Sequence, residues 1–159
     1  MEKSHEFFLE YALSLAVKQA GDNCLGGPFA AVVVKDGEII AEGANQVTAT
    51  NDPTAHAEIV AIREACKKLK TFQLDDCAIY SSCEPCPMCL GAIFWARPKA
   101  VYFASTRSHA AEVGFDDAFI YEQINLTGDL RKIPFIYIPV PNCLEPFSIW
   151  NSNLRKIKY

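Results

Sequence analysis

The apolar positions in the first part of the chain change from helical to strand spacing. Between Glu2 and Ala20 they recur at helical spacing and Gly21 ends the run, which predicts an amphipathic helix packed on a sheet. Two β-rich segments, residues 29–34 and 38–43, then flank Lys35-Asp36-Gly37, and Asp-Gly between such segments is a strong hairpin signal. Because the first of these strands is apolar throughout, we expect helices to cover both faces of its sheet.

The middle of the chain alternates helix and strand. Four elements are expected after a polar connection at residues 45–51: a helix from Asp52-Pro53 to about Leu69, a strand at 77–82, a helix at 87–96 and a buried strand at 100–104. Strand, helix and strand in this order favour a right-handed parallel crossover. The pattern therefore predicts a three-layer α/β domain.

The last part of the chain is harder to interpret. Residues 133–140 form a β-like run bordered by prolines, which suggests an edge strand or an extended arm. The segment from Pro146 to Tyr159 is rich in aromatics, could form a short helix, and needs something to cover it, for which a partner subunit is one candidate. No repeat or linker divides the chain, so residues 1–159 are expected to form one domain.

Charge and cysteine content narrow the functional classes. The formal net charge is −4, and the only local basic cluster is Arg155-Lys156-Ile157-Lys158, which argues against a nucleic-acid substrate. The polar start and the lack of a membrane-length apolar run argue against a signal peptide or a membrane anchor. Seven cysteines, including a C-x-x-C pair, fit a reducing compartment and metal binding, so we expect a cytoplasmic protein.

One split motif carries the chemistry. His56, Cys86 and Cys89 offer one imidazole and two thiolates, which suit zinc and leave the fourth position of a catalytic site open for water. Two helix N-termini would face the metal, and their N–H groups favour thiolate over thiol. The spacing H-x-E followed by P-C-x-x-C matches zinc-dependent nucleobase deaminases.

Glu58 has a role that this metal fills poorly. A zinc ion neutralised by two thiolates polarises its water less than one held by imidazoles, so a base is wanted. Glu58 could take a proton from the water and pass it to the substrate as general base and then general acid.

Other interpretations compete at several positions. With Cys83 as a fourth ligand the site would be a closed structural zinc site, although such a site has no use for Glu58. Asn45 is either a turn residue or an amide that binds substrate. The turn at Asp116-Asp117 is either a helix cap or the source of a second active-site carboxylate.

With these motifs in place, the chain resembles bacterial guanine deaminases of the cytidine-deaminase-like fold over nearly its whole length. The metal motif, Thr54-Ala55-His56-Ala57-Glu58 with Pro85-Cys86-Pro87-Met88-Cys89, is common to the superfamily. The segments similar to guanine deaminases in particular are Gly27-Pro28-Phe29, Asn45, Trp95-Ala96-Arg97-Pro98, Gly114-Phe115-Asp116-Asp117, Phe119-Ile120-Tyr121 and the terminal Tyr159.

The resemblance implies a fold and an assembly. It implies a mixed five-stranded sheet between helices, one zinc ion per subunit, and a homodimer that exchanges its C-terminal segment, residues 141–159. It also implies hydrolysis of guanine to xanthine and ammonia.

The resemblance implies roles for single residues as well. His56, Cys86 and Cys89 would bind zinc, while Glu58 and Asp117 would carry protons. Asn45 would bind the polar edge of the purine base, Phe29 and Trp95 would line its pocket, and Tyr159 would close the site from the neighbouring chain. The choice of Asp117 over Asp116 follows from this alignment.

Alternative substrates remain open at this stage. A guanosine deaminase would need an open mouth for the ribose, and a tRNA adenosine deaminase would carry basic residues around its site. A cytosine deaminase would share the same metal motif.

Overall fold

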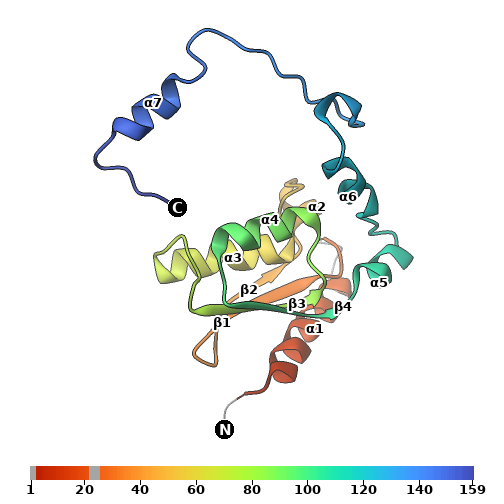
Figure 1. The fold of residues 1–159 in the computed structure, drawn as a ribbon. Helices are drawn as coiled ribbons and strands as arrows, with labels where there is room; N and C mark the ends of the chain where they lie inside the picture. The colour runs from red at the N-terminus through yellow and green to blue at the C-terminus, as the bar shows by residue number, and fades with distance from the viewer. Residues whose placement is uncertain (1–2, 22–25) are drawn as a thin grey trace. The chain divides into compact units, whose positions relative to one another are not determined.

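The computed structural model describes residues 3–21 and 26–159, which fall into two compact units (Figure 1). The first unit ends at Asp117 and holds the sheet, and the second runs from Ala118 to Tyr159. Cys24 lies outside the described residues.

Four strands form the sheet of the first unit, in the order β2-β1-β3-β4. They are β1 (Ala30–Lys35), β2 (Glu38–Ala44), β3 (Cys77–Cys83) and β4 (Ala100–Ser105). Strand β1 pairs antiparallel with β2 and β3, whereas β3 and β4 are parallel. Both the predicted hairpin and the predicted parallel connection are therefore present.

The hairpin turn has the backbone that Asp-Gly favours. Asp36 has φ 51° and Gly37 has φ 75°. Positive φ at two successive turn positions is typical of the type I′ turn, whose twist matches that of the strands it joins.

The expected fifth strand is absent from the described residues. Residues 133–140 form no strand, and the sheet has four strands among the residues that the structure describes. Pro134 and Pro139 lie inside this run and Pro141 follows it, and each proline removes a backbone donor that a ladder would need.

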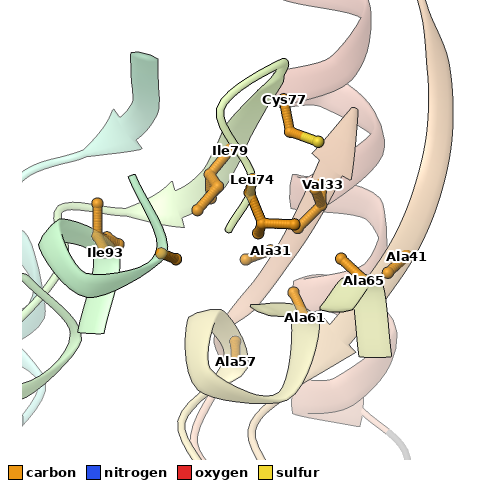
Figure 2. Packing of buried hydrophobic residues seen from close by; sticks show 11 residues of the cluster. Ala31, Val33, Ala41, Ala57, Ala61, Ala65, Leu74, Cys77, Ile79 and Ile93 are labelled. Atoms are coloured by element: carbon orange, nitrogen blue, oxygen red, sulfur yellow. The ribbon is translucent and has the colours of Figure 1, made fainter. Parts of the chain in front are cut away.

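Helices cover the two faces of the sheet, as the apolar first strand predicted. Helix α1 (His5–Gly21) packs on one face, where its Phe8 meets Val32 and Val34 of β1. Helix α3 (Ala57–Leu69) packs on the other face, against Ala31 and Val33 of the same strand, and Ile93 of helix α4 (Pro87–Ala96) belongs to the same apolar cluster (Figure 2). The α/β/α arrangement is therefore confirmed.

Two details of the first unit differ from the sequence prediction. Strand β4 is an edge strand with Phe103 44% exposed, not a buried strand, because β3 is its one neighbour among the described residues. The connection after β2 contains a short helix, α2 (Val47–Thr50), and a second short helix, α5 (Arg107–Glu112), follows β4.

The second unit contains helix α6 (Ala118–Ile124), a 3₁₀ turn η1 (Gly128–Leu130) and helix α7 (Glu145–Ser152). None of its residues is buried. Its large apolar side chains are exposed, among them Phe147 at 70% and Trp150 at 46%. Within the described residues, no helix is long and apolar enough to cross a membrane.

Small residues set the distance between α3 and the sheet. Ala57, Ala61 and Ala65 recur every fourth residue on α3 and are fully buried. A Cβ added at Gly43 of β2 would lie 2.2 Å from the backbone oxygen of Ala57 and 2.5 Å from the backbone nitrogen of Ala61. The helix that begins next to His56 therefore lies as close to the strand as its backbone allows.

We expect Gly43→Ala to lower the free energy of unfolding by about 1–3 kcal/mol, because backbone atoms must move to admit the methyl group. Gly21→Ala is the matched control, since nothing lies within 4 Å of a Cβ there. Urea titrations of both variants measure the effect, and equal stability of the two would contradict the packing argument.

Candidate metal centre

Two helices begin at the same point, and each begins with a candidate ligand. His56 is the N-cap of α3 with φ −68° and ψ 156°, and Cys86 is the N-cap of α4 with φ −67° and ψ 168°. Neither side chain makes a capping hydrogen bond to its own helix. Both side chains are thus available to a common centre, and Pro87 begins α4 as expected.

The predicted start of the first metal helix was wrong by one turn. The helix begins at Ala57, because Asp52 makes a separate turn. Its Oδ1 accepts hydrogen bonds from the backbone N–H of Thr54 at 2.8 Å and from the Thr54 hydroxyl at 2.7 Å. This turn satisfies the polar groups ahead of the helix and leaves His56 in the N-cap position.

The three predicted ligands converge. Nδ1 of His56 lies 3.5 Å from Sγ of Cys86 and 3.6 Å from Sγ of Cys89, and the three ligand atoms all lie within 4.8 Å of one another. A tetrahedral zinc ion with Zn–S near 2.3 Å and Zn–N near 2.0–2.1 Å requires nitrogen-to-sulfur distances of about 3.6 Å. The donor set and its spacing therefore fit zinc.

Local electrostatics prepare one ligand, Cys86, for a cation. A hydrogen bond from Cys89, aided by His56 and the backbone N–H of Cys89, lowers the pKa of Cys86 to about 4. The hydrogen bond with Cys86 in turn raises the pKa of His56. Cys86 is therefore a thiolate near neutral pH, in the form that zinc binds.

Glu58 lies one residue into α3, beside the ligands. Its carboxylate is buried, and burial raises its pKa. Sγ of Cys89 donates a hydrogen bond to Oε2 at 3.4 Å, and the Ser81 hydroxyl donates one to Oε1 at 3.1 Å. A carboxyl group held at a metal centre with a raised pKa suits proton transfer near neutral pH.

Cys83 does not belong to the ligand set. Its sulfur points at the backbone oxygen of Thr106, 3.6 Å away. Among the described residues, the group that could hold a metal consists of His56, Cys86 and Cys89 only. Three protein ligands leave one position of a tetrahedral ion for water, as in catalytic rather than structural sites.

Asn45 is buried at the end of β2 and acts as a turn residue. Its Oδ1 accepts the backbone N–H of Val47 at 3.1 Å, and its backbone N–H donates to the carbonyl of Phe29 at 3.0 Å. The backbone N–H of Gln46 donates to Ala55 at 2.9 Å, next to His56. These bonds place Asn45 and Phe29 at the same edge of the sheet as the metal ligands.

The other predicted site residues have different settings. Asp117 is half-buried, and its pKa is raised by burial and by the nearby Cys86 thiolate, whereas Asp116 is exposed. Trp95 lies in the last turn of α4 and is 64% exposed. Tyr159 belongs to the second unit and is exposed.

Two features of the site were missed from the sequence. Ser81 donates a hydrogen bond to Glu58. The sequence signal for this contact was a polar residue at an inward position of an otherwise apolar strand. Gly26 is the other: a Cβ there would lie 2.3 Å from Oδ1 of Asn45, so glycine allows the loop to pass beside that amide.

Comparison with known proteins identifies the family. Residues 2–105 match the cytidine and deoxycytidylate deaminase zinc-binding region. The chain therefore belongs to this family of zinc-binding deaminases, whose metal the His56, Cys86 and Cys89 cluster is able to hold.

Within the family, individual relatives match to different extents. The chain is 56% identical to the guanine deaminase of Bacillus subtilis over 98% of its own length and 99% of that protein. The crystal structure of that enzyme superposes with a TM-score of 0.96 and covers 99% of each chain at 55% identity.

More distant relatives include both guanine and tRNA deaminases. The guanine deaminase of Nitrosomonas europaea is 35% identical with a TM-score of 0.66, covering 72% of this chain and 65% of that one. The tRNA-specific adenosine deaminase of Aquifex aeolicus is 34% identical over 92% of this chain and 95% of that protein.

We expect Cys83→Ser to retain one zinc ion per chain after dialysis and Cys86→Ser to lose most of its zinc. The reason is that, of these two cysteines, Cys86 belongs to the ligand set and Cys83 does not. Removal of a zinc ligand costs far more affinity than changes outside the ligand set. Elemental analysis of both variants measures this, and zinc loss from Cys83→Ser would restore the closed structural site.

Proposed function

We propose that the protein is a zinc-dependent guanine deaminase that hydrolyses guanine to xanthine and ammonia. The observation that carries this proposal is a three-ligand metal centre with a buried glutamate, in a chain that matches a guanine deaminase from end to end. The reaction adds water, forms a C–O bond at the ring carbon that bears the amine, and breaks the C–N bond to that amine.

The residues around the metal divide the chemistry. When bound to His56, Cys86 and Cys89, zinc supplies a positive charge that makes a neighbouring water more acidic. Glu58 accepts the proton of the attacking water and returns it to the adjacent ring nitrogen of guanine. It then carries a second proton, taken from the newly bonded hydroxyl group, to the departing amine, so that this oxygen becomes the carbonyl of xanthine and ammonia leaves as a neutral molecule.

Asp117 acts as the second acid, which contacts the purine and helps Glu58 to protonate it. Its half-buried position and its nearness to the Cys86 thiolate support this role, because both raise its pKa and help the carboxyl group to hold a proton. Asp116 is exposed.

Asn45 and Phe29 bind the purine. Because Oδ1 of Asn45 already accepts the N–H of Val47, its amide NH₂ is the end that donates to an acceptor on the base. Phe29 is fixed beside it by an edge contact to Phe115, with ring centroids 4.9 Å apart, and presents an aromatic wall for a flat base. Trp95 forms a further wall once its exposed ring is covered.

The active protein is a homodimer that exchanges residues 141–159, and Tyr159 closes the site of the neighbouring chain. The second unit supports this assembly, since it buries no residue of its own and exposes Phe147 and Trp150. Helix α4 also exposes Leu90 and Phe94, which are four residues apart and share one face. Apolar surfaces of this extent mark contacts between proteins.

A tRNA substrate is the second candidate, and the charge disfavours it. The relative from Aquifex aeolicus is named a tRNA-specific adenosine deaminase. This chain, however, carries a net charge of −4, which repels a phosphate backbone. Guanosine and cytosine would undergo the same chemistry, and the size of the pocket decides whether either one is a substrate.

The free thiols of Cys77 and Cys83 fit a reducing compartment, and we place the enzyme in the cytoplasm.

We expect the zinc-loaded protein to release ammonia from guanine and much less from guanosine, cytosine or adenine. Glu58→Gln should lower kcat by a factor of about 10²–10⁴, which is the usual contribution of a general acid–base residue. Ammonia assays with the four substrates measure both, and zinc content shows that the variant still binds metal.

The outcomes separate the candidates. Turnover of guanosine with little turnover of guanine would place the substrate among nucleosides, and deamination of adenosine in a tRNA stem-loop would support the second candidate.

Subunit exchange is tested by mixing two defective chains. Glu58→Gln and a chain that lacks only Tyr159 should each be inactive, whereas unfolding and refolding them together should restore roughly a quarter of wild-type activity if the tail crosses between subunits. No recovery in the mixture, with both chains dimeric, would show that each tail serves its own subunit.

A further inference from the structure

Ser81 is a buried residue of β3 beside Glu58 and is only 1% exposed. It lies on β3 opposite Ala31 of β1, two residues after Ile79, so both side chains are on the face that α3 covers. The neighbours of Ser81 on this face are apolar, and a buried hydroxyl is unfavourable there unless it is hydrogen-bonded. Its partner is Oε1 of Glu58, 3.1 Å away.

The two oxygens of Glu58 face different surroundings. Oε1 faces the sheet and accepts from Ser81, whereas Oε2 faces the ligand Cys89, whose sulfur is 3.4 Å away. The oxygen on the ligand side is the one that can reach a water at the metal. A bond that fixes Oε1 therefore also fixes the direction of Oε2.

Metal loading removes one of these two contacts. A cysteine that binds zinc does so as a thiolate and has no proton to donate, so Cys89 cannot remain a donor to Glu58. The Ser81 hydroxyl keeps its proton whether or not zinc is bound. The contact from Ser81 to the Glu58 carboxylate is therefore independent of the metal.

We propose that Ser81 is the positioning residue of the proton carrier: its hydroxyl anchors Oε1 of Glu58 to the sheet and holds Oε2 toward the metal-bound reactants. This inference rests on the proposed function, because it assigns Ser81 a part in guanine deamination. In this role Ser81 acts through Glu58, the partner of its hydroxyl group.

The adjacent residue provides a matched control. Ser82 is also a serine on β3, 3% exposed, but its hydroxyl accepts the backbone N–H of Ala30 at 3.1 Å. Ser82→Ala removes a hydroxyl of equal burial from the same strand without touching the proton carrier. Any loss that is common to both variants reflects the strand and not Glu58.

We expect Ser81→Ala to lower kcat for guanine by about tenfold to a hundredfold, the usual effect of a hydrogen bond to a charged group. KM and the zinc content should stay at the wild-type values, because neither the base nor the metal loses a contact. Ser81→Thr, which keeps the hydroxyl, should recover most of the rate, and Ser82→Ala should stay within about threefold of wild type. Wild-type kcat in Ser81→Ala, or zinc loss in step with the rate, would overturn the proposal.

A double-variant cycle with Glu58→Gln tests whether Ser81 acts through Glu58. If it does, Ser81→Ala should not lower the residual rate of Glu58→Gln further, whereas independent roles would give additive losses and overturn the proposal. If the wild type releases no ammonia from guanine, the proposed function has failed by itself. The cycle is then read from the thermal midpoints of the zinc-loaded proteins with Glu58→Ala in place of Glu58→Gln, because a glutamine amide oxygen would still accept the Ser81 hydroxyl. Coupled shifts support the Ser81–Glu58 bond, and additive shifts overturn it.

Discussion

The metal centre depends on one constraint: the N-termini of helices α3 and α4 must meet at the same place. His56 and Cys86 are the N-caps of α3 and α4, and neither side chain makes a capping hydrogen bond to its own helix. The sheet fixes this meeting, since Gly43 sets the approach of α3 and the β3–α4–β4 connection sets that of α4. The resulting nitrogen-to-sulfur distances of 3.5 and 3.6 Å are those of a tetrahedral zinc ion. The other residues of the centre lie around this point: Glu58 is the second residue of α3, Cys89 lies in the first turn of α4, and Ser81 contacts Glu58 from β3.

The chemistry of the centre follows from what surrounds it. Exposed helix N–H groups and the neighbouring hydrogen bonds hold Cys86 as a thiolate, while burial raises the pKa of Glu58. A metal neutralised by two thiolates activates water weakly, and a nearby carboxyl group that can hold a proton compensates for this. The proposed division of work between zinc and Glu58 therefore matches the ligand types.

Much of the first unit could be predicted because its signals are local. Asp36-Gly37 specifies a hairpin, the apolar run of β1 specifies a sheet covered on both faces, and Pro87 marks the first residue of α4. The metal ligands could be predicted because their spacing has few other uses. The start of α3 could not, since Asp52 makes a turn with Thr54 that resembles a helix cap in sequence. Ser81 was missed because its partner is 23 residues away. The proline-bordered run at 133–140 looked like a strand in composition but lacks donors for pairing.

The central claim is that the zinc ion has three protein ligands, two of them sulfur, and one position left for water. X-ray absorption at the zinc edge of the loaded wild-type protein tests this most directly, because sulfur and lighter ligands differ in distance and scattering. The account predicts two sulfur atoms near 2.3 Å and two nitrogen or oxygen atoms at about 2.0–2.1 Å. A third sulfur in the shell would mean that Cys83 closes the site, and would contradict the catalytic assignment.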